Sequence, residues 1–296
     1  AFTGDGGTSE GDFHEALNTA AVWDLPVIFI IENNGYGLST PVNEQFRCGQ
    51  LVDKAKGYGI EGVRIDGNNI LEVYDTIKGV RDYCIRTQKP YLIECMTFRM
   101  RGHEEASGTK YVPAALFEEW GKKDPVKNFE QWLIEQHVLT ELNIAEIRNE
   151  IKDHIETELK LAYEAKPLVP DTEEEMGDMY AAYKPESREL RVTGGGLEAG
   201  PEKRFIDGIK EGLYQSMQKH PNLILMGQDI AEYGGAFKIT EGFVNEFGRS
   251  RVRNTPLCES AIVGTALGLS LEGYKAMMEM QFADFVTVGF NQIINN

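Results

Sequence analysis

The chain has 296 residues, of which 42% are hydrophobic and 26% charged, an ordinary globular composition with room for about two domains of ~150 residues. Its formal net charge of −17 argues against partners that select basic patches, namely nucleic acid and anionic membrane surfaces. The four cysteines form no CxxC pair, and no apolar run approaches the ~20 residues that cross a bilayer. We therefore expect a cytoplasmic protein without a zinc site or a disulfide framework.

In residues 1–112, segments with apolar residues at helical spacing alternate with short continuous apolar runs. This pattern predicts alternating helices and strands. A helix with Ser9 as its N-cap precedes the continuous apolar run 27–31, which is typical of a strand buried on both faces. A second helix follows near residues 70–80 and a second strand at 91–96. The apolar face of the first helix comprises Phe13, Ala16, Leu17, Ala20 and Ala21. This alternation favours a parallel sheet, whose functional turns lie at the carboxyl ends of its strands.

The remainder of the chain divides into three stretches. Residues 113–165 are predicted to be helical, with one apolar stripe that favours packing. The stripe comprises Ile144, Ile147, Ile151, Ile155 and Leu159. Residues 166–202 contain four prolines, an acidic run at 171–175 and three glycines at 194–196, which predict a linker. Residues 203–296 return to an α/β pattern, which predicts a second domain.

A spaced pair of short motifs lies at the predicted strand ends of the first domain. Gly4-Asp5-Gly6 and Asn33-Asn34 are separated by 26 residues that form a helix and a strand. Asp5, the Asn34 amide and one backbone carbonyl from the turn at Gly35 and Tyr36 could form the protein half of an octahedral Mg²⁺ site. Gly6 and Gly7 allow backbone N–H groups to approach a phosphate at a helix N-terminus. This spacing therefore predicts a site for a metal and a diphosphate.

The same residues resemble the thiamine diphosphate motif, and the runs 4–11 and 32–37 resemble the α subunit of the first component of 2-oxo acid dehydrogenases. The runs 226–230, 233–238 and 254–259 are similar to the β subunit of that component. The resemblance implies an α/β fold with two parallel-sheet domains of the thiamine diphosphate-binding type, joined by a helical segment and an acidic linker. Two subunits in one polypeptide, α before β, imply a fused form.

In the domain organisation that follows, residues 1–112 form the diphosphate-binding domain and residues 203–296 the pyrimidine-binding domain. Residues 113–165 are the helical tail of the α-like part, and residues 166–202 are the linker. The chain begins inside a predicted strand and stops inside a predicted helix, so we expect a fragment of a longer protein.

The resemblance also implies two groups that act on the cofactor. In the β subunits, a glutamate at the position of Glu259 hydrogen-bonds the cofactor's aminopyrimidine, and in the α subunits a loop like 99–103 brings Arg99 and His103 to the diphosphate and the lipoyl group. Without the resemblance, Glu259 is explained as a helix-start glutamate and the basic loop as a solvated one. Cys258 has no evident His partner and is best explained as a small buried residue. Gln228 departs from the acid common at its position in the family, which weakens a proton relay through it.

The candidate site can be stated by role. The candidate catalytic residues are Glu259 and His103. The candidate cofactor-binding residues are Asp5, Gly6, Gly7, Asn34, Tyr36, Arg99 and Glu259, and the candidate metal ligands are Asp5, Asn34 and Tyr36.

The implied function is the oxidative decarboxylation of a 2-oxo acid with acyl transfer to a lipoyl-bearing dihydrolipoyl acyltransferase, using thiamine diphosphate and Mg²⁺. The runs 254–259 and 281–285 look closer to the branched-chain β subunit than to the pyruvate one, which favours 3-methyl-2-oxobutanoate, with Phe282 and Phe285 as a candidate apolar wall or as ordinary core. Alternatives are a pyruvate dehydrogenase first component, a transketolase-like thiamine enzyme and a noncatalytic docking module. Because the two domains must meet to form the site, we also expect a homo-oligomer of the fused chain.

Overall fold

The computed structural model describes residues 1–104, 106, 108–179 and 202–296. It divides into one compact unit of Ala1–Phe129 with Arg204–Asn296 and a second unit of Glu130–Lys203. The predicted glycine linker at 194–196 lies outside the described residues. Among the helices described, none combines the length and the apolar character that crossing a membrane requires.

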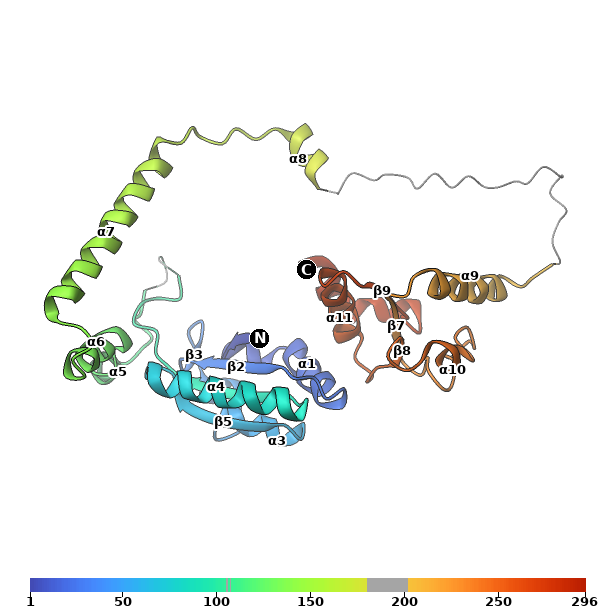
Figure 1. Ribbon diagram of the computed structural model, residues 1–296, viewed down its shortest axis with the longest axis horizontal. Coiled ribbons are helices and arrows are strands. Elements are labelled where there is room, and N and C mark those ends of the chain that lie inside the picture. Colours follow the sequence, from blue (N-terminus) through green and yellow to red (C-terminus); the bar gives the residue numbers. More distant parts are fainter. Residues whose placement is uncertain (105, 107, 180–201) are drawn as a thin grey trace. The chain divides into compact units, whose positions relative to one another are not determined.

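A parallel sheet of four strands organises the N-terminal part of the first unit, with the order β1-β2-β6-β5. Figure 1 labels β2 and β5 of this sheet. Its strands are β1 (Phe2–Gly4), β2 (Ile28–Asn33), β5 (Glu61–Asp66) and β6 (Tyr91–Met96). The main helices are α1 (Gly11–Val22) and α4 (Ile70–Thr87), with short helices α2 (Val42–Gln45) and α3 (Lys54–Gly57) and the short hairpin β3 (Tyr36–Gly37) and β4 (Thr40–Pro41). The parallel sheet was predicted, whereas β5 was missed because only Ile65 of this edge strand is buried.

Two apolar clusters cover the two faces of this sheet. Phe13 and Leu17 of α1 pack with Ile31 and Leu92 on one side. Val80 and Cys84 of α4 pack with Ile65 and Ile93 on the other. Each fully buried aliphatic side chain contributes about 1.5–3 kcal/mol relative to exposure, so these faces fix the strand ends that carry the candidate site.

The start of α1 differs from the prediction. The helix begins at Gly11 after Glu10, and Ser9 is the last residue of the preceding 3₁₀ turn, Gly6–Ser9, so Ser9 is not the N-cap. The reason lies in the turn itself, because the Thr8 backbone N–H and Oγ1 both donate to the Asp5 carbonyl, at 3.2 and 2.7 Å. These bonds keep the chain in a tight turn through Ser9 and delay the helix.

The C-terminal part of the first unit is a second parallel sheet, with the order β8-β7-β9. Its strands are β7 (Leu223–Gly227), β8 (Val252–Asn254) and β9 (Lys275–Met278), and its helices are α9 (Phe205–Lys219), α10 (Phe243–Phe247), α11 (Glu259–Leu271) and α12 (Phe290–Asn295). Met217 of α9 packs with Leu225 and Val252. Arg251 donates to the carbonyls of Met217 (2.7 Å) and His220 (2.8 Å), which satisfies the C-terminal end of α9. The prediction of two α/β domains with parallel sheets is therefore confirmed.

Helices connect the two sheets in sequence. They are α5 (Ala114–Gly121), α6 (Pro125–Glu135), α7 (Glu141–Glu164) and α8 (Thr172–Asp178). The stripe residues Ile147, Ile151, Ile155 and Leu159 are exposed, so among the described residues the expected packing of this stripe is not found.

The acidic run at 171–175 is not wholly an extended linker, because α8 begins within it. The Asp171 side chain accepts from the N–H groups of Glu173 (3.0 Å) and Glu174 (3.1 Å) and so caps the helix. The glutamates of its first turn lie where the helix dipole favours negative charge.

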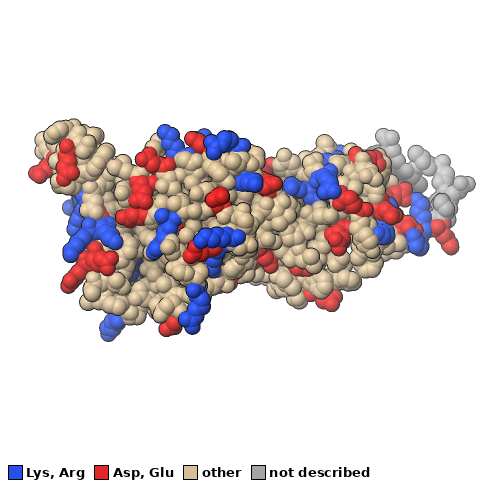
Figure 2. Space-filling model, turned by 90° about the horizontal axis from the view of Figure 1, so that it is seen from below, with Lys and Arg blue, Asp and Glu red and all other residues tan. Residues whose placement is uncertain are grey.

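On the face drawn in Figure 2, acidic side chains are interspersed with lysines and arginines.

Candidate active site

Asp5 is a buried carboxylate directly after β1, with 1% of its surface exposed. Its Oδ1 accepts from the Asn34 backbone N–H at 3.3 Å, whereas its buried Oδ2 has no hydrogen-bond partner among the described residues. Burial raises the pKa of Asp5, and the Asn34 N–H and the charge of Arg99 act against that shift. A buried carboxylate oxygen without a partner is costly unless a cation or proton meets it, which makes this atom a candidate binding position.

The two asparagines of the Asn33-Asn34 pair have different surroundings. Asn34 Oδ1 accepts from the Tyr36 N–H at 3.1 Å, and the neighbouring Gly35 carbonyl accepts from Val42 at 3.1 Å. Because the Gly35 carbonyl already accepts a hydrogen bond, the Tyr36 carbonyl is the better candidate metal ligand in this turn.

Asn33 instead serves the interior of the sheet. Its Nδ2 donates at 2.7 Å to Glu94, which is 1% exposed. Glu94 also accepts from the Val52 N–H at 2.9 Å and lies 3.8 Å from Arg64. Asn33 therefore braces a buried carboxylate and leaves Asn34 as the candidate ligand.

The turn at Gly6 and Gly7 has no room for side chains. A Cβ on Gly7 would lie 2.4 Å from Thr3 Oγ1, and one on Gly6 would lie 3.0 Å from the Gly37 Cα. Lys54 Nζ donates to the Thr8 carbonyl at 2.8 Å and ties this turn to α3. Burial lowers the pKa of Lys54. Local packing therefore favours glycine at both positions, and Lys54 holds the turn from the side.

Arg99 is the residue of the candidate basic loop with several hydrogen-bond partners. Arg99 donates to the Leu38 carbonyl at 2.6 Å and to the Tyr111 hydroxyl at 3.1 Å, and its Nη1 lies 3.0 Å from His103 Nδ1. Because a guanidinium can only donate, Nδ1 is the acceptor and a neutral His103 carries its proton on Nε2. Tyr111 also meets Tyr36 edge to face at 5.7 Å between ring centroids. Residues 105 and 107 of the loop lie outside the described residues.

Glu259 is the first residue of α11 and is partly buried. Its Oε1 accepts from Nε2 of Gln228, the residue directly after β7, at 2.9 Å. The adjacent Cys258 is 5% exposed, and burial raises the pKa of its thiol, which favours the interpretation of Cys258 as a small buried residue.

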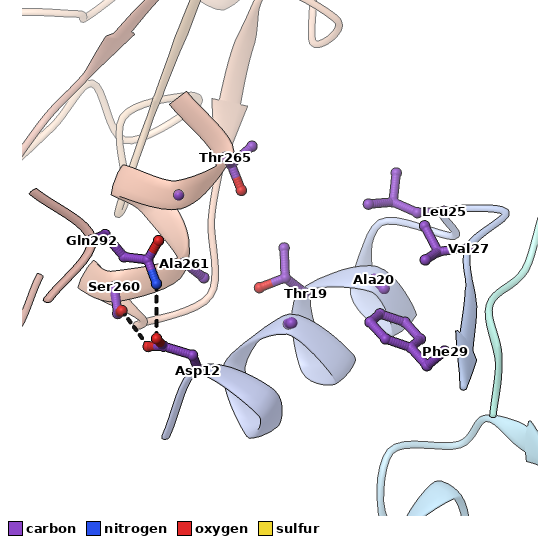
Figure 3. A pocket seen from close by; sticks show the side chains of 12 residues that line it. Asp12, Thr19, Ala20, Leu25, Val27, Phe29, Ser260, Ala261, Thr265 and Gln292 are labelled. Carbon is purple, nitrogen blue, oxygen red and sulfur yellow. Dashed lines mark hydrogen bonds between the residues drawn. The ribbon is translucent and has the colours of Figure 1, made fainter. Parts of the chain in front are cut away.

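Carboxylates of α1 hold the first turn of α11. Glu15 accepts from the Ala261 N–H at 2.8 Å, and Asp12 accepts from Ser260 Oγ at 2.6 Å and from Gln292 Nε2 at 2.8 Å (Figure 3). No side chain caps α11 from its own N-cap residue, Cys258, so these contacts from α1 supply acceptors to that turn.

The structure thus brings the predicted residues together as two groups. Asp5, Asn34, Tyr36 and the Arg99 loop form one group at the ends of β1 and β2, and Glu259 with Gln228 forms the other. The groups are connected through α1, which follows the Asp5 turn and contacts the first turn of α11. A pocket of about 290 Å³ lies along this α1–α11 contact, but its lining includes neither Asp5 nor Glu259 (Figure 3).

Sequence reasoning missed several residues that support the site. Glu94, Lys54 and Tyr111 each contact a predicted motif from elsewhere in the chain. Glu94 gave one signal, because a carboxylate in the middle of an apolar strand requires buried partners. Lys54 and Tyr111 stand in ordinary polar stretches, and their partners are set by tertiary structure alone.

Comparisons with known proteins match both parts of the chain. Residues 1–171 match the family model of the dehydrogenase E1 component, and residues 202–296 match that of the transketolase pyrimidine-binding domain.

Among curated relatives, the 2-oxoisovalerate dehydrogenase subunit alpha 2 of Arabidopsis thaliana is 40% identical over 182 residues, 60% of this chain and 38% of the relative. The alpha subunit of the acetoin:2,6-dichlorophenolindophenol oxidoreductase of Bacillus subtilis is 36% identical over 62% of this chain and 54% of the relative. The pyruvate dehydrogenase E1 component subunit alpha of Staphylococcus aureus is 35% identical over 62% of this chain and 52% of the relative. The matched region thus spans about two fifths to one half of each relative. The predicted resemblance is confirmed: the chain belongs to the dehydrogenase E1 component family and carries a transketolase-type pyrimidine-binding domain after it.

Proposed function

We propose that this chain acts in the thiamine diphosphate-dependent first component of a 2-oxo acid dehydrogenase, which decarboxylates a 2-oxo acid and passes the acyl group to a lipoyl-bearing acyltransferase. The observation that carries the proposal is Asp5 Oδ2, a buried carboxylate oxygen without a partner among the described residues, beside the Asn34 turn. Membership of the dehydrogenase E1 component family supports it.

The residues present fit Mg²⁺ and a diphosphate. Asp5 Oδ2, Asn34 Oδ1 and the Tyr36 carbonyl are hard oxygen donors of the kind that Mg²⁺ prefers, and Asn34 Oδ1 keeps acceptor capacity beside its bond from the Tyr36 N–H. The turn at Gly6 and Gly7 leaves little space for side chains, and it precedes α1. The first N–H groups of a helix favour an anion.

The roles of the chain's own side chains follow from this arrangement. Thiamine diphosphate, when bound, supplies a carbanion-forming thiazolium that holds the electrons released when carbon dioxide leaves. Arg99 supplies positive charge, and His103 offers Nε2–H as a proton donor, since its Nδ1 accepts from Arg99. Glu259 is the acid that donates a hydrogen bond to the aminopyrimidine ring.

For the substrate we favour a branched-chain 2-oxo acid such as 3-methyl-2-oxobutanoate. The 2-oxoisovalerate dehydrogenase relative is 40% identical, against 35% for the pyruvate dehydrogenase relative. Phe282 meets Phe237 at 6.0 Å and Phe285 at 5.4 Å between ring centroids, and it is 46% exposed. Phe282 is therefore not ordinary core, and this aromatic cluster is available as an apolar wall.

The test compares kcat/KM for 3-methyl-2-oxobutanoate and pyruvate in the intact protein with an artificial electron acceptor. Each additional methyl group in an apolar pocket contributes about 1–3 kcal/mol, so we expect a preference of at least about tenfold for the branched acid. A preference for pyruvate would overturn the substrate assignment and leave the reaction class standing.

The reaction class has its own control. Mg²⁺ with thiamine diphosphate should raise the melting temperature of the wild-type protein but not of an Asp5→Ala variant, because only a ligand that binds the folded state stabilises it. A noncatalytic docking module would show neither this stabilisation nor decarboxylation. The acyltransferase partner, Mg²⁺ and a homo-oligomeric assembly are parts of the same proposal.

A further inference from the structure

Gln228 is a buried amide at the carboxyl end of the central strand of the second sheet. It is 4% exposed, and its Nε2 donates to Glu259 Oε1 at 2.9 Å. A polar amide that is this deeply buried needs hydrogen-bond partners. The partner of its Nε2 is the side chain of Glu259, the proposed catalytic acid.

The backbones that carry both side chains are held in place. The Gly227 carbonyl, just before Gln228, accepts from the Thr255 N–H at 2.9 Å, and the Met226 carbonyl accepts from the Glu279 N–H at 2.9 Å. A Cβ on Gly227 would lie 2.9 Å from the Glu279 Cβ, so the ends of β7 and β9 pack closely here. On the other side, Glu15 holds the Ala261 N–H in the turn that begins with Glu259. The contact between Gln228 and Glu259 is therefore set by the fold.

The direction of this hydrogen bond has a chemical consequence. An amide N–H donates, so Oε1 of Glu259 is an acceptor. Because the carbonyl oxygen of a carboxylic acid accepts more strongly than its hydroxyl oxygen, this contact favours Oε2 as the position of the proton in the acid form. Among the described residues, Oε2 has no hydrogen-bond partner. We propose that Gln228 is a positioning residue that fixes the proton of Glu259 on Oε2, the oxygen left to donate to the cofactor's aminopyrimidine. This inference rests on the proposed function of Glu259.

The amide accounts for this role better than an acid at the same position. Two carboxyl groups at 2.9 Å would share one proton, which either group could hold, and the pair would titrate in coupled steps. The amide does not ionise in the physiological range, so its N–H group remains a hydrogen-bond donor throughout that range. The departure of Gln228 from the family's usual acid thus has a physical explanation in this chain.

Two variants separate the contact from its role. Gln228→Glu keeps the shape and adds a second carboxyl, whereas Gln228→Leu keeps approximate size and removes the donor. Gln136→Glu, at an exposed position in the second unit, controls for the added charge.

The first measurement needs no cofactor. The free energy of unfolding is measured against pH for the intact protein. In Gln228→Glu the folded carboxyl pair retains a proton that the unfolded chain releases near pH 4.3, about the ordinary pKa of glutamate. The folded state then binds more protons, so stability falls as pH rises above that value. The Gln136→Glu control should lack this added slope, and equal slopes in both variants would overturn the contact.

The second measurement is the rate of hydrogen–deuterium exchange at the reactive thiazolium carbon of bound thiamine diphosphate. We expect Gln228→Leu to slow exchange about tenfold while changing the Kd of the cofactor by less than about twofold, since one hydrogen bond to an ionisable group is lost and the phosphate site is untouched. Wild-type exchange in Gln228→Leu would overturn the positioning role alone. A wild-type protein that binds no thiamine diphosphate would instead overturn the proposed function, and with it this inference.

Discussion

Two carboxyl groups occupy comparable places in the two sheets, and they are prepared in opposite ways. Asp5 follows β1, is 1% exposed, and has one oxygen without a partner among the described residues. Glu259 comes after β8 of the second sheet, at the start of α11, is partly buried, and has one oxygen engaged by an amide. We propose that the first group meets a cation and that the second holds its proton on one particular oxygen. The partners around each carboxyl group therefore decide its chemistry, and the motif letters alone do not.

Among the variants that test this comparison, Asp5→Ala should have the largest effect, which is on cofactor affinity. Removing the candidate ligand should weaken Mg²⁺-dependent binding of thiamine diphosphate by about 4 kcal/mol, roughly 1000-fold in Kd. The fold should persist, because the substitution removes one long hydrogen bond, from the Asn34 N–H to Oδ1 at 3.3 Å, and Oδ2 has no hydrogen-bond partner among the described residues. Isothermal titration calorimetry measures the affinity and circular dichroism the fold. Asp5→Asn is the matched control for loss of charge with retention of shape, and unchanged affinity in Asp5→Ala would refute the ligand assignment.

Glu259→Gln should slow exchange at the thiazolium carbon without changing the surroundings of Asp5. The variant keeps the side-chain size but removes the acid, so exchange at the thiazolium carbon should slow by about 100-fold or more, the range of general acid–base catalysis. Cofactor affinity should stay near that of the wild type, because the phosphate and metal ligands are unchanged. Wild-type exchange rates in this variant would contradict the assigned role of Glu259.

Asp12→Ala tests the helix contact that connects the two groups. Asp12 accepts from Ser260, Gln292 and Asn291, the last at 2.9 Å, so the variant leaves three donors without their acceptor. We expect a loss of about 2 kcal/mol in the free energy of unfolding, measured with urea. Asp75→Ala, at an exposed position of α4, is the control and should lose less than about 0.5 kcal/mol. Equal losses in the two variants would show that the Asp12 contacts with α11 and α12 do not stabilise the fold.

The smallest effect concerns Glu279, which follows β9 and has its Oε1 buried without a hydrogen-bond partner among the described residues. Burial raises the pKa of Glu279, so its contribution to stability is present below the unfolded pKa of about 4.3 and is lost as pH rises through the folded value. Glu279→Gln should remove this part of the pH dependence. Thermal unfolding between about pH 4 and 8 measures it. An unchanged pH profile in Glu279→Gln would contradict the burial argument.

Local patterns in the sequence predicted much of the fold, with specific exceptions. The apolar run of β2 and the helical period of α1 identified both elements, because buried faces impose a period on the sequence. The edge strand β5 escaped because an exposed edge imposes little pattern. The helix α8 also escaped, because an acidic run indicates solvation equally in a linker and in a helix capped by Asp171.

The candidate site shows the same division. Asp5 and Asn34 could be named from spacing, since the turns at the ends of adjacent parallel strands meet at one edge of the sheet. The separate use of Asn33 to hold Glu94 could not, because it depends on a residue 61 positions away.

By itself, the sequence determined which residues can supply oxygen ligands, which turns require glycine and which faces must be buried, because these properties follow from side-chain chemistry and local backbone geometry. Only the tertiary structure decided that Asp5 Oδ2 has no partner among the described residues, that Lys54 braces the turn at Gly6–Ser9 and that Gln228 donates to Glu259. These pairings join residues far apart along the chain. Their distances are set by how the sheets and helices pack, which no local pattern records.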